Sequence, residues 1–141
     1  MKMRLACMAF TMSALALTAR LGADDLTGQD RLLCAAVQVR ECTTAGDCRA
    51  ETPWNLNLPQ FVEVDLKAKT VAATRASGEN RVSPIRSMSR EGGEIILQGF
   101  ENGRAFSFLI EEDTGAASIA VAEDGMTVSV FGACTPISPG K

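Results

Sequence analysis

The fold is decided by residues 94–134, which read EIILQGFENGRAFSFLIEEDTGAASIAVAEDGMTVSVFGAC. Turn residues divide this stretch into four short runs. Asn102-Gly103 and Asp124-Gly125 are dipeptides that accept the positive φ angles of two-residue hairpin turns. Glycines recur at intervals of 10, 12 and 10 residues, at Gly93, Gly103, Gly115 and Gly125. This spacing predicts an antiparallel meander, in which each strand and its turn repeat every 8–12 residues or so.

Between the turns, apolar and small or polar side chains alternate. Phe106, Phe108 and Ile110 share one face of the predicted strand, and Ser107 and Leu109 lie on the other. A period of two indicates a strand with one buried face and one solvated face. Because an isolated hairpin is only marginally stable in water, these strands need further partners from the upstream chain.

Four upstream segments supply those partners, at residues 33–41, 61–66, 70–74 and 85–90. In the first of them we expect Val37 and Val39 to point inward. The connections at residues 42–59 and 76–84 are predicted to be loops, because they are rich in polar residues and proline. The total is eight strands, each joined to its neighbour in sequence. The prediction is an all-β domain that closes as a small up-and-down barrel, and a two-layer sandwich is the alternative.

The cysteines predict how the sheet is fastened. Without the first 23 residues the chain keeps four of them, Cys34, Cys42, Cys48 and Cys134, and three pairings are possible. We favour Cys42 with Cys48, across a polar turn, which leaves Cys34 to bond Cys134 and to tie the first strand to the last. A zinc site is not predicted, because the four spacings contain no pair separated by two to four residues.

The amino terminus has the features of a secretion signal. Lys2 and Arg4 precede an apolar run that ends at Ala19, and small residues near Ala23 suit a cleavage site. We therefore predict a signal peptide at residues 1–23, a flexible segment at 24–32, a β domain at 33–135 and a tail at 136–141. The expected location is the periplasm or the exterior of the cell, where disulfides persist.

Charge limits the kinds of partner. Removal of residues 1–23 would leave 11 basic and 17 acidic residues, a net charge of −6. An acidic domain without a cluster of lysine and arginine is not expected to bind nucleic acid or an anionic membrane surface. The apolar run that ends at Ala19 is too short for a stable membrane span, so none is expected in the mature protein.

Most catalytic arrangements are excluded by composition. The chain contains no histidine, which removes serine–histidine, cysteine–histidine and histidine–metal chemistry. It has neither a P-loop nor a dinucleotide fingerprint, and no cofactor is predicted. The acidic groups at residues 111–113 and 123–124 fall in turns that a meander places at opposite ends of the domain. Paired carboxylates acting on a sugar must lie within roughly 10 Å of each other. The prediction is therefore a protein that is not an enzyme.

Loop placement indicates a binding end. If the strands alternate in direction, the two long loops gather at one end of the barrel together with the turns at residues 102 and 124. Long loops in a compact domain are commonly functional. The candidate binding residues at this end are Trp54, Arg75, Arg81 and Arg104. Trp54 is assigned as a lid or contact residue, and the alternative is that it plugs the barrel mouth.

Two segments carry a resemblance. Leu58-Pro59-Gln60-Phe61 with Val64-Asp65-Leu66, and residues 130–135 (VFGACT), resemble small exported proteobacterial proteins of unknown function. The resemblance implies a β domain and transfers no catalytic residue. Three functional hypotheses follow: a module that binds a protein or another envelope component, a lipocalin-like carrier of a small apolar ligand, and a carboxylate-dependent hydrolase.

Overall fold

A computed structural model describes residues 24–137 of the chain. The predicted signal peptide and the last four residues of the predicted tail lie outside this range. Strands make up most of the described part: β1 (Arg31–Thr43), β2 (Cys48–Glu51), β3 (Phe61–Asp65), β4 (Thr70–Ala73), β5 (Val82–Glu91), β6 (Glu94–Glu101), β7 (Arg104–Glu111), β8 (Ala116–Glu123) and β9 (Met126–Pro136). Two short 3-10 helices, η1 (Pro53–Leu56) and η2 (Arg75–Ser77), interrupt the loops. Among these residues there is no helical segment with the length and apolarity to cross a membrane.

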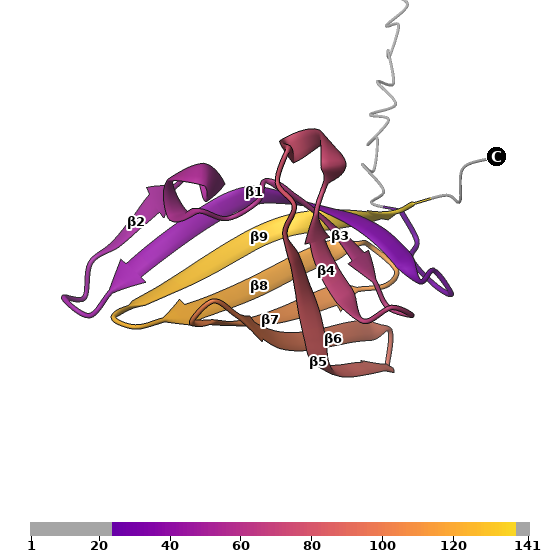
Figure 1. The fold of residues 1–141 in the computed structure, drawn as a ribbon. Helices are drawn as coiled ribbons and strands as arrows, with labels where there is room; N and C mark the ends of the chain where they lie inside the picture. The colour runs from indigo at the N-terminus through magenta and orange to yellow at the C-terminus, as the bar shows by residue number, and fades with distance from the viewer. Residues whose placement is uncertain (1–23, 138–141) are drawn as a thin grey trace, which may run out of the picture.

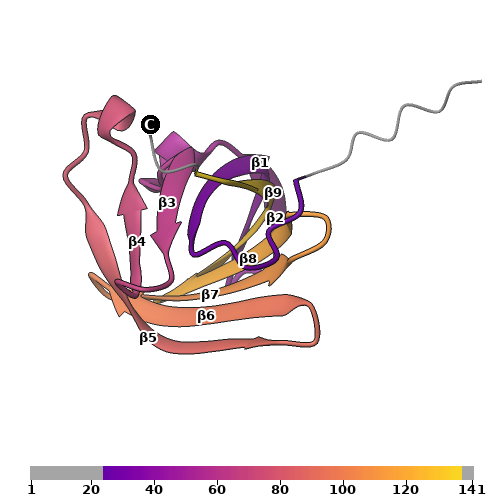
Figure 2. The ribbon, with the colours of Figure 1, turned by 90° about the vertical axis from the view of Figure 1, so that its right-hand side faces the viewer.

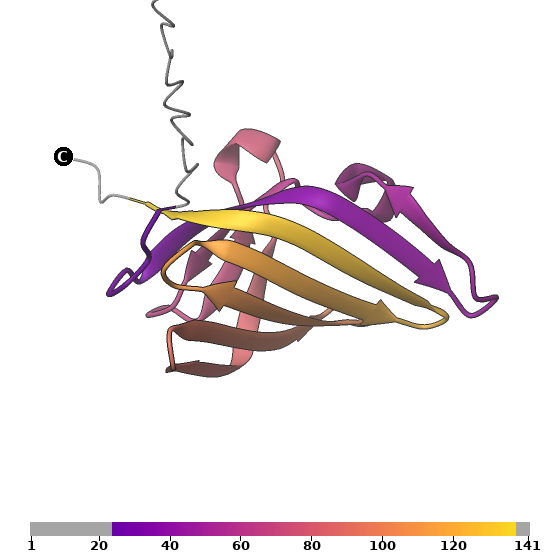
Figure 3. The same ribbon diagram turned by 180° about the vertical axis from the view of Figure 1, so that it is seen from behind.

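The strands close into the predicted eight-stranded antiparallel barrel. β1 pairs with β3, and each strand from β3 to β8 pairs with the strand that follows it in the chain. β9 also pairs with β1, which closes the ring. The closing register is long, running from Leu32 opposite Pro136 to Thr43 opposite Met126. Figure 2 shows the ring of strands, and Figure 3 shows β9 lying between β1 and β8. The barrel prediction is confirmed, and the two-layer sandwich is not the architecture.

Glycine at position 132 permits this closure. A Cβ atom on Gly132 would lie 2.1 Å from the carbonyl oxygen of Ala35 on β1. No side chain fits at that distance, so any other residue would push the two closing strands apart. Closure of the barrel therefore depends on a specific residue of β9 as well as on hydrogen bonding.

Both predicted disulfides are present. Cys34 and Cys134 are direct cross-strand partners with a Cα–Cα distance of 4.0 Å, and both side chains are buried inside the barrel. Cys42 and Cys48 join β1 to β2, with a Cα–Cα distance of 4.1 Å. Two disulfides indicate an oxidising, non-cytoplasmic environment.

The barrel interior holds two apolar clusters. The larger one contains the most deeply buried side chains, among them Leu26, Leu32, Ile95, Leu97 and Ile110. The smaller one lies along the other half of β1 and β9 and contains Val39, Leu56, Val121, Val128 and Val130. Phe106 and Ile119 pack against both clusters. The space between the two clusters is where the candidate site forms.

Residues 24–30 close one end of the barrel. The sequence analysis placed them in a flexible segment, but Leu26 is fully buried in the larger cluster. The backbone N–H of Leu26 donates to the carbonyl of Glu112, and Arg90 donates to the carbonyl of Leu26. A single leucine between charged and polar residues carries no periodic signal, which is why the sequence analysis missed this contact. The segment is part of the folded domain, and its last predicted residues, 31 and 32, already belong to β1.

Four further predictions need correction. Val37 does not point inward, because a bulge in β1 between Ala36 and Gln38 turns it outward and leaves it 77% exposed. The loop predicted at residues 42–59 contains β2 and η1, and Figure 1 shows β2 beside the end of β1. The strand predicted to begin at residue 85 begins at Val82. The tail predicted at residues 136–141 starts one residue too early, since β9 runs to Pro136.

Candidate functional site

The end of the barrel opposite residues 24–30 is open, and we call it the mouth. The connection between β1 and β3, the loop between β4 and β5, and the turns at residues 102–103 and 124–125 all lie there, because the strands alternate in direction. A cavity of about 100 Å³ opens at the mouth between the two apolar clusters, and we call it the mouth pocket. Its wall includes Ala36, Val39, Leu58, Val62, Val71, Ala73, Phe106 and Ile119.

Small side chains create this space. Val71 and Ala73 share the inward face of β4, and Ala73 pairs across the sheet with Val62. Ala36 occupies the last inward position of β1 before the bulge, and β1 is separated from β4 by β3 alone. Alanine at both places leaves a space between the two apolar clusters, beside Phe106 and Ile119, which pack against both. The pocket therefore follows from side-chain size at positions whose backbone is fixed by the barrel.

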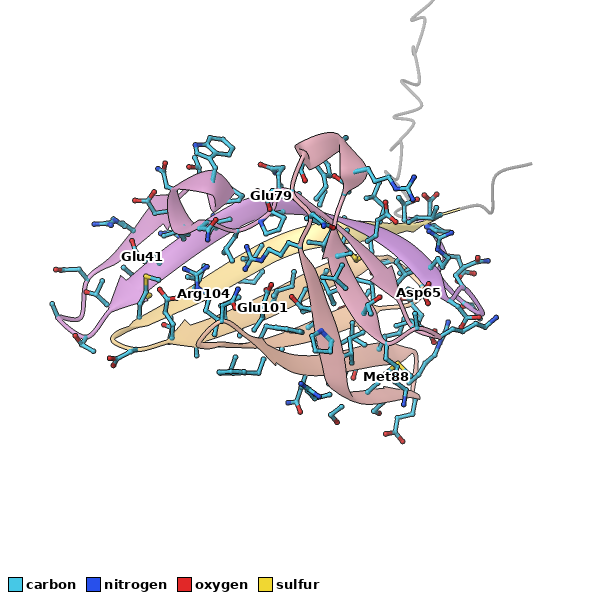
Figure 4. All side chains as sticks on the ribbon, in the orientation of Figure 1. Glu41, Asp65, Glu79, Met88, Glu101 and Arg104 are labelled. Carbon is cyan, nitrogen blue, oxygen red and sulfur yellow. A yellow bond between two sulfur atoms is a disulfide. The ribbon has the colours of Figure 1, made fainter. Side chains whose placement is uncertain are left out.

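Four charged residues form a quartet at the mouth: Arg81, Glu101, Arg104 and Glu123. Glu101, Arg104 and Glu123 take the last inward positions at the mouth ends of β6, β7 and β8, and Arg81 directly precedes β5, so the signs alternate around the rim. The Nε–H of Arg81 donates to both carboxylate oxygens of Glu101 at 3.0 Å, and the Nε–H of Arg104 donates to Glu123. All four side chains are largely buried, with exposed fractions of 17–26%. Figure 4 shows Glu101 and Arg104 next to each other.

The two arginines also hold the segment that follows η1. Nη1 of Arg81 donates to the carbonyl of Asn57 at 2.8 Å, and Nη1 of Arg104 donates to the carbonyl of Leu56 at 2.9 Å. Asn57 has a positive φ of 52° and turns the chain so that both carbonyls face the rim. Leu58 and Gln60, the residues that follow, line the mouth pocket. The quartet thus fixes the part of the pocket wall that Leu58 and Gln60 form.

The pKa of Glu101 reports this environment. Burial by itself would raise the pKa, because it disfavours the charged carboxylate. Hydrogen bonds from Arg81 and Ser83 and the charges of Arg81 and Arg104 outweigh burial, and the pKa of Glu101 is lowered. Glu101 is therefore ionised in the folded domain at neutral pH and keeps Arg81 in place.

The lowered pKa predicts a dependence of stability on pH. Protons bind Glu101 more readily in the unfolded chain, so its stabilising contribution is complete above the ordinary pKa of glutamate and is lost as the pH falls through the lower folded value. We expect Glu101→Gln to reduce the free energy of unfolding by about 1–3 kcal/mol at neutral pH, since Arg81 loses its charged partner. The loss should shrink between about pH 6 and about pH 3.5, measured by urea denaturation followed by circular dichroism.

Glu79→Gln is the matched control for this measurement. Glu79 follows η2, is exposed, and makes no ion pair within residues 24–137. Its replacement should leave the stability within about 0.5 kcal/mol of the wild type at every pH. A Glu101→Gln deficit of the same size at both pH values would contradict the role assigned to Glu101.

The structure brings together two of the four binding residues predicted from sequence. Arg81 and Arg104 line the mouth pocket. Trp54 lies in η1, directly after Pro53, which lines the pocket, and its side chain is 67% exposed, so it does not plug the mouth. Arg75 lies in η2, is exposed, and does not line the pocket.

Sequence reasoning missed the two acids of the quartet. The signal was present, because Glu101 shares the inward parity of Ile95 and Leu97, and Glu123 shares that of Val121. Continuing each alternating pattern to the mouth end of its strand would have placed both carboxylates inward beside the arginines. Glu123 was instead predicted to be an ordinary residue of the turn at residues 123–124, and no role was predicted for Glu101.

The acidic groups of the chain do not assemble into a metal-binding cluster. No group of three or more potential ligands occurs within residues 24–137. As predicted from the meander, residues 111–113 and 123–124 lie at opposite ends of β8. At the mouth, each glutamate of the quartet is paired with an arginine. The comparison of the chain with protein-family models and with curated proteins found no match.

Proposed function

We propose that the domain is a non-enzymatic, exported binding module that docks a protein partner at the barrel mouth. The observation that carries this proposal is an open, mainly apolar pocket at a mouth whose surrounding segments carry an exposed tryptophan. Trp54 follows a pocket-lining residue in the same helical turn and is 67% exposed. Exposed tryptophan beside an apolar pocket is the composition of a binding hot spot. The periplasm or the cell exterior suits a domain with two disulfides.

The size of the pocket favours a protein over a carried small molecule. Pockets that enclose drug-sized ligands measure roughly 300–1,000 Å³. The mouth pocket has a volume of about 100 Å³, which accepts one group from a molecule that otherwise stays outside. A lipocalin-like carrier would need the remaining interior, which the larger apolar cluster fills.

The hydrolase hypothesis has less support. A general acid needs a raised pKa near neutral pH, whereas the pKa of Glu101 is lowered. Glu123, the other carboxylate of the rim, is paired with Arg104. Both acids act as anchors for arginine side chains, and a binding role is consistent with that arrangement.

Site-specific photo-crosslinking tests the proposal. A photoreactive p-benzoylphenylalanine placed at Trp54 should capture a protein in an envelope extract of the source organism, and the same group at Ala120 should not. Ala120 is exposed on the outer wall of β8, away from the mouth. Trp54→Ala should weaken binding of the identified partner about tenfold or more, measured by titration calorimetry. Equal capture from both positions, or unchanged affinity of Trp54→Ala, would refute the proposal.

A further inference from the structure

The mouth pocket is sized for a small aliphatic group. An engineered protein cavity of about 150 Å³ accepts benzene, which has six carbons. Scaled to about 100 Å³, the mouth pocket holds roughly four carbons, the size of an isobutyl group. Its wall is formed mainly by alanine, valine, leucine, isoleucine and phenylalanine side chains. A leucine side chain fits this space, whereas an indole or a long acyl chain does not.

Two of the hydrogen-bond donors beside the pocket have no acceptor in the described residues 24–137. Arg81 and Arg104 use Nε and Nη1 for the quartet and for the carbonyls that follow η1. Within residues 24–137 neither Nη2 group has a hydrogen-bond acceptor, and neither is sealed from solvent. Both arginines line the pocket. A ligand that fills the pocket can therefore satisfy these N–H groups with an acceptor oxygen.

Charge indicates which acceptor is suitable. The two arginines and two glutamates of the quartet cancel, so the rim offers an incoming anion no net attraction. All 17 acidic residues but only 10 of the 14 basic residues fall within residues 24–137, which gives this part a net charge of −7. This net negative charge repels a carboxylate that approaches the mouth, whereas it does not repel a neutral carbonyl group. A peptide carbonyl has the required acceptor and no charge.

We infer that the mouth pocket recognises a leucine-sized aliphatic side chain within a peptide of the partner. The side chain enters between the two apolar clusters, and a neighbouring peptide carbonyl accepts a hydrogen bond from Nη2 of Arg81 or Arg104. This inference rests on the proposed function, because it describes what the docked protein inserts. It makes the pocket specific for an internal aliphatic residue of a protein chain.

Capped amino acids test the chemistry without a known partner. N-acetyl-leucine N-methylamide is titrated into the oxidised protein, with methyl NMR signals of Leu58 and Val71 as the readout. We expect saturable shifts at both residues. N-acetyl-alanine N-methylamide, which lacks three carbons, should bind about tenfold or more weakly, and N-acetyl-leucine, which carries a carboxylate, should also bind more weakly.

Two matched variants locate the binding. Ala73→Leu fills the pocket and should abolish the shifts, whereas Ala120→Leu makes the same change on the outer wall of β8 and should leave them unchanged. Arg81→Lys keeps the charge facing Glu101 but removes Nη2 together with the Nη1 group that donates to the carbonyl of Asn57, and it should weaken binding of the leucine amide. The dispersion of the remaining NMR signals verifies that each variant is folded.

Three results would overturn the inference: no saturable shift in the wild-type protein, equal binding by Ala73→Leu, or tighter binding of the carboxylate than of the amide. These failures are separate from failure of the proposed function. A partner captured at Trp54 by crosslinking, combined with no response to the leucine amide, would refute the pocket chemistry alone. Absence of capture at Trp54 would refute the docking role itself.

Discussion

Replacing both Cys34 and Cys134 with alanine is expected to lower the free energy of unfolding by about 4–5 kcal/mol. The bond closes a loop with a sequence separation of 100 residues, and in the chain-entropy model a cross-link over that length strongly restricts the unfolded chain. Both side chains are also buried in the barrel, and Cys34 lines the mouth pocket. Chemical denaturation of the oxidised protein, followed by circular dichroism, measures the loss.

The second disulfide supplies the control. Cys42 and Cys48 are separated by only 6 residues, so replacing both with alanine should cost about 2 kcal/mol. That bond joins β1 to β2, which lies outside the closed ring of eight strands. Equal losses from the two double substitutions would mean that fastening the first strand to the last contributes nothing beyond local packing.

Leu26→Ala is expected to destabilise the domain by about 2–5 kcal/mol, the range for removing a fully buried leucine. Leu26 has no exposed surface and packs in the larger apolar cluster, although it lies only two residues after the first described residue. Its loss would open a cavity at the closed end of the barrel and weaken the contacts of residues 24–30. The measurement is again the free energy of unfolding.

Leu109→Ala is the matched substitution. Leu109 lies on the outward face of β7 and is 38% exposed, so its loss should cost about 1 kcal/mol. If Leu26→Ala and Leu109→Ala proved equally mild, residues 24–30 would be a loosely attached segment, as the sequence analysis expected, and the closed end of the barrel would need another explanation.

Alternation and turn chemistry were sufficient to predict the barrel. The turn at Asn102-Gly103 has positive φ at both residues, and the inward parity of Phe106, Phe108 and Ile110 matches their burial in the structure. The polar turn between Cys42 and Cys48 predicted the first disulfide, which left Cys34 to bond Cys134. Local signals determine these features, and a single sequence displays them.

Features that depend on tertiary contacts were not predictable in the same way. The bulge that turns Val37 outward is a property of the β1–β9 pairing, and neighbouring residues do not specify it. Leu26 is isolated in a polar segment, so only the folded barrel reveals its burial. For the site, sequence identified Arg81 and Arg104 as candidates, but the pocket between two clusters follows from the sizes of residues far apart in the chain, such as Ala36 and Ala73.

The position of Trp54 has a practical consequence for spectroscopy. It is the single tryptophan of a chain without tyrosine, and most of its indole already contacts water in the folded protein. Its emission will therefore change little when the barrel melts, and fluorescence is a poor probe of folding here. Any blue shift on adding a second molecule would instead report that the rim of the barrel has been covered.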